Sequence, residues 1–192
     1  MPRSAARAWS SARTLTDLGE LTAQWLEGSL ATLPGGAYRG GPDEETGPLV
    51  PVLAALNRSG FVTLQSQPGC DGPAFDGRRW QQRAAVMCLT DAAGLQQLTR
   101  TARGAGLLLA AHRADRPGPV RDILVTTWGG NGHTGFGGRL RKSHIRREYA
   151  GCHRDAVRAA QDARQVTLVD PCWGRDTLLW PELSKLLATV AN

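Results

Sequence analysis

The sequence contains no complete catalytic signature, and it has few of the residues that would narrow its function. Its four cysteines include no C-x-x-C pair, so the short ligand spacing of a structural zinc site is missing. No apolar run is long enough to span a bilayer, and no secretory leader is visible. We therefore expect a reduced, cytoplasmic protein that needs no metal and no cofactor. Lysine is also scarce, because 21 of the 23 basic residues are arginine.

The length and the charge of the chain set broad limits. A chain of 192 residues fits a single domain. Residues 1–13 are rich in arginine and serine and contain no acid, so we expect a flexible N-terminus there and one domain over residues 14–192. The net charge of +6 favours anionic partners, either small molecules or nucleic acid, and gives no sign of a membrane partner. The oligomeric state stays open.

Apolar strand patterns alternate with helical patterns along the chain. Short β-branched or apolar runs predict strands near residues 61–64, 84–90, 107–111, 123–127 and 165–169. Segments with helical spacing lie between them, among them residues 92–103 and 146–163. This alternation predicts a single-domain α/β fold, with a mainly parallel sheet of about five strands and helices on both faces.

A glycine-dense stretch followed by cations stands out near the middle of the chain. Six of the ten residues from Gly129 to Gly138 are glycine, so the backbone can bring its N–H groups close to a bound anion. Five cations follow within residues 139–147, and arginine suits phosphate or carboxylate. The spacing matches neither common nucleotide loop. The predicted anion-binding residues are Gly129, Gly130, Asn131, Arg139 and Arg141; the alternative is a mobile loop beside a solvated basic face.

Further candidates follow two of the predicted strands. In an open α/β sheet, ligands bind at the carboxyl ends of the strands. Gln65, Ser66 and Gln67 lie there after the first predicted strand, and we expect them to bind substrate. Asp170 follows the last predicted strand and is a candidate proton-transfer group, with Arg175 as a binding residue beside it. The alternative roles are turn closure for the first group, and helix capping or an ion pair for Asp170.

Two more side chains are candidates for acid–base chemistry. His133 lies in the glycine-dense stretch and can exchange protons near neutral pH. Glu45 belongs to an acidic group in the loop over residues 34–48, which is alternatively a solvated turn. A cysteine nucleophile beside His133 or His153 is a further alternative, although most free cysteines are inert core residues; the candidates are Cys70, Cys152 and Cys172.

Three segments carry a resemblance to a known family. They are SGFVTLQSQPG (residues 59–69), WQQRAAV (residues 80–86) and LVDPCWGRDTLLWP (residues 168–181). Through them the chain resembles an uncharacterised family of small actinobacterial (Streptomyces-type) proteins, a domain of unknown function, over most of its length. The resemblance implies a bacterial, cytoplasmic origin, and it implies no mechanism and no catalytic residue.

These observations support three hypotheses. The leading one is a small α/β enzyme, a hydrolase or group transferase, that acts on an anionic small molecule such as a nucleotide-like or phosphorylated compound. It requires residues 65–67, 129–141 and 170–175 to meet at one pocket. The first alternative is a nucleic-acid-binding protein that uses the basic segment 139–147, with Trp80 or Trp128 for stacking. The second is a protein-interaction or regulatory module with a tryptophan-rich surface, which burial of Trp9, Trp128 and Trp173 would weaken.

Overall fold

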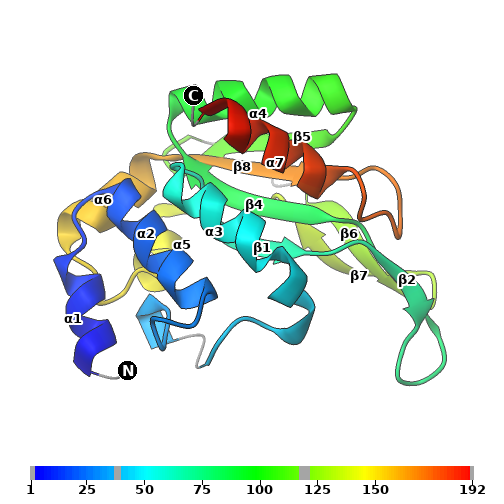
Figure 1. Cartoon of the computed structure of the whole chain (residues 1–192), viewed down its shortest axis with the longest axis horizontal. Coiled ribbons are helices and arrows are strands. Elements are labelled where there is room, and N and C mark those ends of the chain that lie inside the picture. The colour runs from blue at the N-terminus through cyan, green and yellow to red at the C-terminus, as the bar shows by residue number, and fades with distance from the viewer. Residues whose placement is uncertain (1–2, 37–39, 117–121, 191–192) are drawn as a thin grey trace.

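The computed structural model describes residues 3–36, 40–116 and 122–190. Within these residues, eight strands form two sheets of four strands each, and the helices lie around them (Figure 1). The strand order is β1-β4-β8-β5 in the first sheet and β2-β3-β6-β7 in the second. Every neighbouring pair of strands is antiparallel. The expectation of a mainly parallel five-stranded sheet is therefore wrong, and the fold is α+β.

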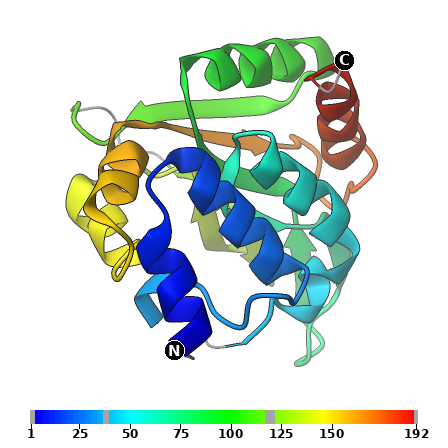
Figure 2. The same cartoon turned by 60° about the vertical axis from the view of Figure 1, so that its left-hand side comes forward.

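The first sheet forms the centre of the molecule. Its strands are β1 (Val62–Gln67), β4 (Ala85–Thr90), β8 (Arg164–Val169) and β5 (Leu108–Arg113). Strand β4 is buried along its whole length, which requires cover on both faces. Helices pack on one face, as Figures 1 and 2 show. They are α2 (Leu15–Leu26), α3 (Val50–Arg58), α4 (Ala92–Ala105) and α7 (Leu179–Val190).

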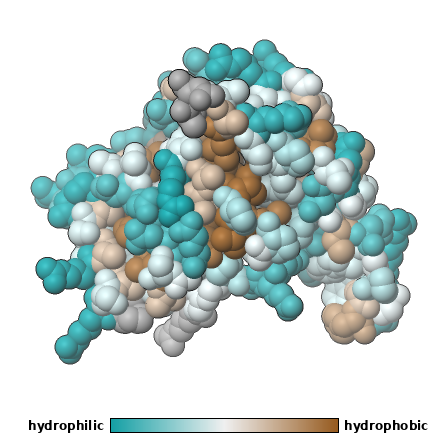
Figure 3. Space-filling view, in the orientation of Figure 1, coloured by the Kyte–Doolittle hydropathy of each residue, from teal (hydrophilic) through white to brown (hydrophobic). Residues whose placement is uncertain are grey.

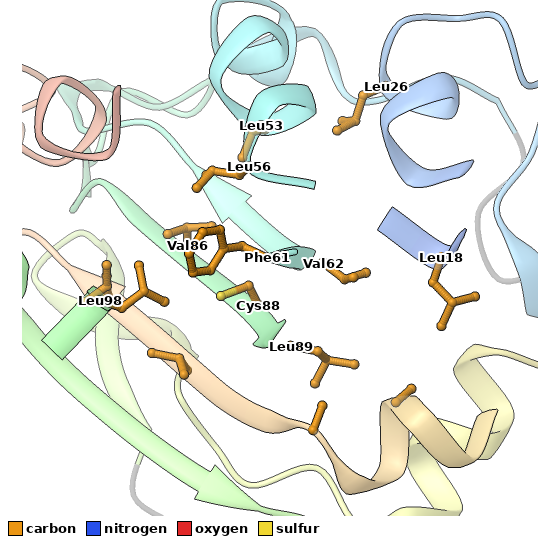
Figure 4. Close-up of a cluster of buried hydrophobic side chains, with 14 of the residues drawn as sticks. Leu18, Leu26, Leu53, Leu56, Phe61, Val62, Val86, Cys88, Leu89 and Leu98 are labelled. Atoms are coloured by element: carbon orange, nitrogen blue, oxygen red, sulfur yellow. The ribbon is translucent and has the colours of Figure 1, made fainter. Parts of the chain in front are cut away.

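The main hydrophobic core lies between these helices and the first sheet. Figure 4 shows Phe61 and Val62 between the side chains of α3 and those of β4. The core also takes in the N-terminal segment that was expected to be flexible. Residues Arg3–Ser11 form helix α1, in which Trp9 is fully buried and donates its indole N–H to the carbonyl of Thr32 at 2.8 Å. Burial of a whole indole ties this helix to the rest of the chain.

The second sheet packs against the other face of β4 and extends beyond it. Its strands are β2 (Cys70–Pro73), β3 (Arg79–Gln82), β6 (Ile123–Trp128) and β7 (Asn131–Phe136). A small apolar cluster joins the two sheets; its buried members are Ala85, Val125, Phe136 and Val169. The β2–β3 hairpin protrudes from the body of the molecule (Figure 1, lower right). Because β1 leads into this hairpin and the chain returns as β4, the two strands are antiparallel.

The glycine-dense stretch is a hairpin rather than a loop. Gly129 and Gly130 have φ values of 58° and 81°, and they join Trp128 to its partner Asn131 across the turn. Positive φ at both central residues is the requirement of a type I′ turn, in which two glycines are favoured. Gly132 and Gly135 belong to β7, whose composition gave no strand pattern, and Gly137 and Gly138 follow its end.

Several helices begin or end at residues that favour helix ends, and one predicted helix is wrong. Thr14 caps α2 in a capping box with Asp17, and Asp91 caps α4, which ends at Gly106 in the left-handed conformation. The helix expected over residues 146–163 is two helices, α5 (Lys142–Glu148) and α6 (Arg154–Asp162). Gly151 separates them with a φ of 92°. The segment before α3 contains two short 3₁₀ helices, η1 (Pro34–Gly36) and η2 (Glu44–Leu49).

Candidate functional site

Four of the predicted site residues line a single cleft beside β1, which we call the β1 cleft. Its volume is about 350 Å³, within the range of small-molecule pockets. Its walls come from α2, η1, residues 42–43, η2, α3, β1, β7 and the end of α5. The predicted residues that line it are Glu45, Gln65, Ser66 and Gln67.

The β1 cleft has an apolar floor and an acidic rim. Trp25 and Phe136 contribute to the floor and are 8% and 6% exposed. Three exposed carboxylates stand at the rim: Asp43, Glu45 and Glu148. Among the described residues that line the cleft there is no lysine or arginine. The charge of these carboxylates is opposite in sign to the net charge of the chain.

Glu45 is held next to the second sheet. The buried side chain of Gln82, on β3, donates from Nε2 to Oε2 of Glu45 at 3.4 Å. A carboxylate has about four lone-pair sites, so this single long hydrogen bond leaves most of its accepting capacity for a ligand. Glu45 is the only one of the three predicted catalytic residues that lies in the β1 cleft.

Gln67 is fixed by hydrogen bonds between the two sheets. Its Nε2 donates to the carbonyls of Arg83 at 2.9 Å and Val125 at 3.0 Å, and its Oε1 accepts from the hydroxyl of Thr126 at 3.2 Å. Only 5% of the residue is exposed. The amide thus has its donors and one acceptor position filled by protein groups, so its main role in the geometry is to join the sheets.

Gln65 and Ser66 meet the β1 cleft through the edge of their strand. All five residues 63–67 line the cleft, although successive side chains of a strand point to opposite faces. Such a run lines a cavity only if the strand presents its edge to it. Strand β1 is indeed the terminal strand of the first sheet.

Asp170 and Arg175 lie outside the β1 cleft and bind each other. Arg175 donates from Nε and Nη2 to the carboxylate of Asp170, with the shortest distance 2.7 Å, and the backbone N–H of Cys172 donates at 2.8 Å. These hydrogen bonds to Asp170 raise the pKa of the Arg175 guanidinium. Asp170 is fully buried, so the arrangement matches the alternative role of an ion pair that closes the turn after β8.

His133 belongs to an aromatic cluster on the second sheet, also away from the β1 cleft. Its ring lies 5.3 Å from Trp80 and 5.7 Å from Trp128. Phe75, in the β2–β3 turn, is 94% exposed and lies 5.6 Å from Trp128, which Arg78 covers at 4.2 Å. Figure 3 shows an apolar patch at the tip of the protruding hairpin. We call Phe75, Trp80, Trp128 and His133 the aromatic patch; Gly129, Gly130 and Asn131 form the turn beside it.

The predicted cations Arg139 and Arg141 are not among the residues that line the β1 cleft, and they are not part of the aromatic patch. Arg139 donates from Nη1 to the carbonyls of Ala114 at 3.3 Å and Arg116 at 2.7 Å, so it anchors the chain beyond β5. Arg141 precedes α5 and is exposed. Helix α5 lies on the opposite side of the molecule in Figure 1 from strands β3 and β6, which carry Trp80 and Trp128, so residues 139–147 and these tryptophans do not form one surface. The residues of the leading hypothesis therefore do not meet at one pocket.

No local pattern in the sequence marks the other lining residues as a ligand site. Thr22 and Trp25 belong to α2, and both are buried. Glu148 comes from the end of α5, about a hundred residues from Glu45 in the sequence, and nothing in its local pattern marks it. Of the tryptophans proposed for an interaction surface, Trp9 is buried, whereas Trp128 and Trp173 are half-buried.

Two of the cysteines are poorly suited to act as nucleophiles. Burial raises the pKa of the Cys88 and Cys152 thiols to about 12, which disfavours the nucleophilic thiolate. No group of three or more histidine, cysteine, aspartate or glutamate side chains that could hold a metal ion occurs among residues 3–36, 40–116 and 122–190.

The comparison with protein families identifies the chain. Residues 4–190 match the model of a domain of unknown function (DUF6919), and the chain belongs to this family. A comparison with curated proteins gives no match. In the described residues, no helix has both the length and the apolar character needed to cross a bilayer.

Proposed function

We propose that the β1 cleft is the functional site and that it binds a polar ligand that is neutral or positively charged. The observation that carries the proposal is the pair of exposed carboxylates at the rim, Glu45 and Glu148, with no lysine or arginine among the described lining residues. Like charges at close range repel, and an apolar floor strengthens electrostatic interactions at the rim. The anionic ligand expected from the sequence stays a prediction, but the local charge favours the opposite sign.

Within this site, Glu45 is the group placed to exchange a proton with the ligand. It is exposed at the rim, and its carboxylate is oriented by Gln82. A carboxylate in hydrogen-bond reach of a ligand can act as a general base. Hydrolysis or group transfer in the β1 cleft stays a prediction, and Asp170 and His133 would have to act elsewhere.

A thermal-shift screen tests the sign of the ligand charge. The panel contains agmatine, arginine amide and a neutral disaccharide, together with ATP, glucose 6-phosphate and a single-stranded DNA oligonucleotide. A ligand present at a hundred times its Kd stabilises the folded state by about 2.7 kcal/mol. For a chain of this size, that raises the Tm by about 5 to 10 °C. We expect the cationic or neutral compounds to produce such shifts and the anionic ones to produce none.

Charge-neutralising variants locate the binding. We expect Glu45→Gln and Glu148→Gln to reduce the shift produced by agmatine or arginine amide. Glu44→Gln is the matched control, because Glu44 is exposed on η2 beside Glu45 but does not line the cleft. Stabilisation by ATP or glucose 6-phosphate alone, or an equal effect of all three variants, would contradict the proposal.

The other hypotheses keep the status of predictions. A nucleic-acid surface would have to use either residues 139–147 or the aromatic patch, since the two are separated; a DNA-dependent shift that falls steeply with salt would support it. An interaction module is compatible with a cleft open along a strand edge. The actinobacterial origin and the cytoplasmic location of this family member likewise stay predictions.

A further inference from the structure

The direction of the backbone groups in β1 follows from one hydrogen bond of Ala84 and from the register of the strands. In an antiparallel sheet, each residue points its N–H and C=O to the same neighbouring strand, and successive residues alternate. The carbonyl of Ala84 accepts from the N–H of Asp170 at 2.9 Å, so the backbone of Ala84 faces β8. Ala85 therefore faces β1 and bonds its partner Gln67, whereas Val86 again faces β8.

Ser66 is the residue whose backbone faces away from the sheet. It lies opposite Val86, and since Val86 bonds β8, the N–H and C=O of Ser66 point to the open edge. Thr63, opposite Cys88, is in the equivalent position, and its N–H indeed turns outward to Oδ1 of Asn57 at 3.0 Å. None of the described residues supplies such a partner to Ser66. Its outward groups are exposed to the β1 cleft, which Ser66 lines.

We propose that the ligand of the β1 cleft is an extended peptide with a lysine or arginine, which adds to β1 as a further strand. This inference rests on the proposed function and names the class of ligand. One residue of the peptide would donate its N–H to the carbonyl of Ser66 and accept from the N–H of Ser66. A strand added in this way lies about 4.8 Å from β1.

The charges around the strand edge favour a basic side chain on this peptide. Glu45 comes from η2 and Glu148 from the end of α5, so carboxylates reach the rim from separate elements. A basic side chain that leaves the added strand toward either element meets an opposite charge. The paired donor and acceptor of Ser66 match the N–H and C=O that a peptide residue in an extended strand presents together.

A selection experiment identifies the peptide class. Three libraries of acetylated, amidated pentapeptides are passed over the full-length protein, with the central residue fixed as arginine, alanine or glutamate. We expect enrichment from the arginine library and none from the glutamate library. If no library is enriched while agmatine still gives a shift that depends on Glu45, the peptide inference fails and the cation-binding site stands. If neither agmatine nor any peptide binds, both fail.

Two variants of Ser66 separate its backbone from its hydroxyl. Ser66→Pro removes the outward N–H at a position where an edge strand tolerates proline, and Ser66→Ala keeps it. A backbone hydrogen bond contributes about 0.5–1.5 kcal/mol, so we expect Ser66→Pro to weaken the best peptide about two- to tenfold. Ser66→Ala should bind it within about twofold of the parent. A loss in Ser66→Ala equal to that in Ser66→Pro would overturn the assignment to the backbone.

Hydrogen exchange gives a readout that does not depend on a variant. In the free protein the N–H groups of Gln65 and Gln67 face β4, so they should exchange slowly, whereas that of Ser66 should exchange fast. The selected peptide should slow the exchange of Ser66 specifically. Slow exchange at Ser66 in the free protein would show that its N–H is already bonded, and would overturn the inference.

Discussion

At the scale of single residues, the carboxyl groups of Asp170 and Glu45 have two different roles in this protein. Asp170 is fully buried and receives a bidentate guanidinium and a backbone N–H, so its lone pairs are used within the fold. Glu45 is exposed at the rim of the β1 cleft and has one long hydrogen bond from Gln82. Position relative to the surface, rather than residue type, therefore selects Glu45 as the group available to a ligand.

The four cysteines should divide into two reactive and two unreactive thiols. Cys70 and Cys172 are exposed, whereas Cys88 and Cys152 have a pKa raised to about 12 by burial. At pH 8 a thiol with that pKa is thiolate in only about one molecule in ten thousand. We expect a colourimetric disulfide reagent to titrate two thiols rapidly in the folded protein and all four in denaturant.

Single substitutions assign this reactivity. Cys70→Ser and Cys172→Ser should each remove one rapidly reacting thiol, whereas Cys88→Ser should leave the rapid count at two. A rapid thiol that disappears with Cys152→Ser would show that its surroundings open in solution, contrary to the partial burial seen in the fold.

At the scale of elements, the capping box of α2 should make a pH-dependent contribution to stability. The carboxylate of Asp17 accepts the backbone N–H of Arg13 at 2.7 Å and that of Thr14 at 2.9 Å, and the first of these is the largest cause of the lowered pKa of Asp17. A carboxylate with a lowered pKa in the folded state stabilises the fold above its unfolded pKa of about 3.9. The contribution disappears as the pH falls through the folded-state pKa.

Asp17→Asn tests this contribution. We expect it to lower the free energy of unfolding by about 0.5–1 kcal/mol at pH 7, and the difference from the parent should shrink below about pH 4. Urea unfolding at several pH values measures both effects. Glu44→Gln makes the same change in charge at an exposed position and should change stability by less than about 0.5 kcal/mol. A deficit in Asp17→Asn that is independent of pH would contradict the role of the charge.

The elements with strong local signals were predictable, and those of the second sheet were not. Thr14, Asp91 and Gly106 mark helix ends through side-chain and backbone chemistry that acts within a few residues. By contrast, β2 is largely exposed, β3 is short and mostly half-buried, and β7 is rich in glycine, so neither alternation nor β-propensity marks them as strands. Without these strands, the chain between β1 and β4 looks like a simple loop, and the remaining alternation of strands and helices suggests parallel pairing.

At the scale of the whole molecule, the sequence predicts part of the candidate site, but the parallel sheet on which that prediction rests does not exist. The sequence predicts Gln65, Ser66 and Gln67 as ligand-binding residues because they follow a predicted strand of a parallel sheet. They belong instead to the edge strand of an antiparallel sheet, and that edge brings them to the β1 cleft. The proximity of Glu148 and Glu45 depends on how distant segments pack, which no local pattern encodes. The separation of Asp170, His133 and Arg139 has the same origin.

The side chain of Gln67 should contribute strongly to holding the two sheets together. It is 5% exposed and joins β1 to Arg83 and to Val125 and Thr126 of β6, while the apolar cluster between the sheets is small. Gln67→Leu would leave the carbonyl of Arg83 and the buried hydroxyl of Thr126 without their partner on Gln67, at about 1–3 kcal/mol for each unsatisfied group. The carbonyl of Val125 would still accept from the backbone N–H of Arg83 at 2.8 Å.

We therefore expect Gln67→Leu to lower the free energy of unfolding by about 2–4 kcal/mol, measured by urea titration. Gln65→Leu places the same side chain two residues away, where it is exposed, and should change stability by less than about 0.5 kcal/mol. Hydrogen exchange should show the loss of protection spreading through β6 and β7 before β8, because Gln67 bonds the second sheet directly. Equal stability of the two variants would mean that apolar packing alone holds the sheets together.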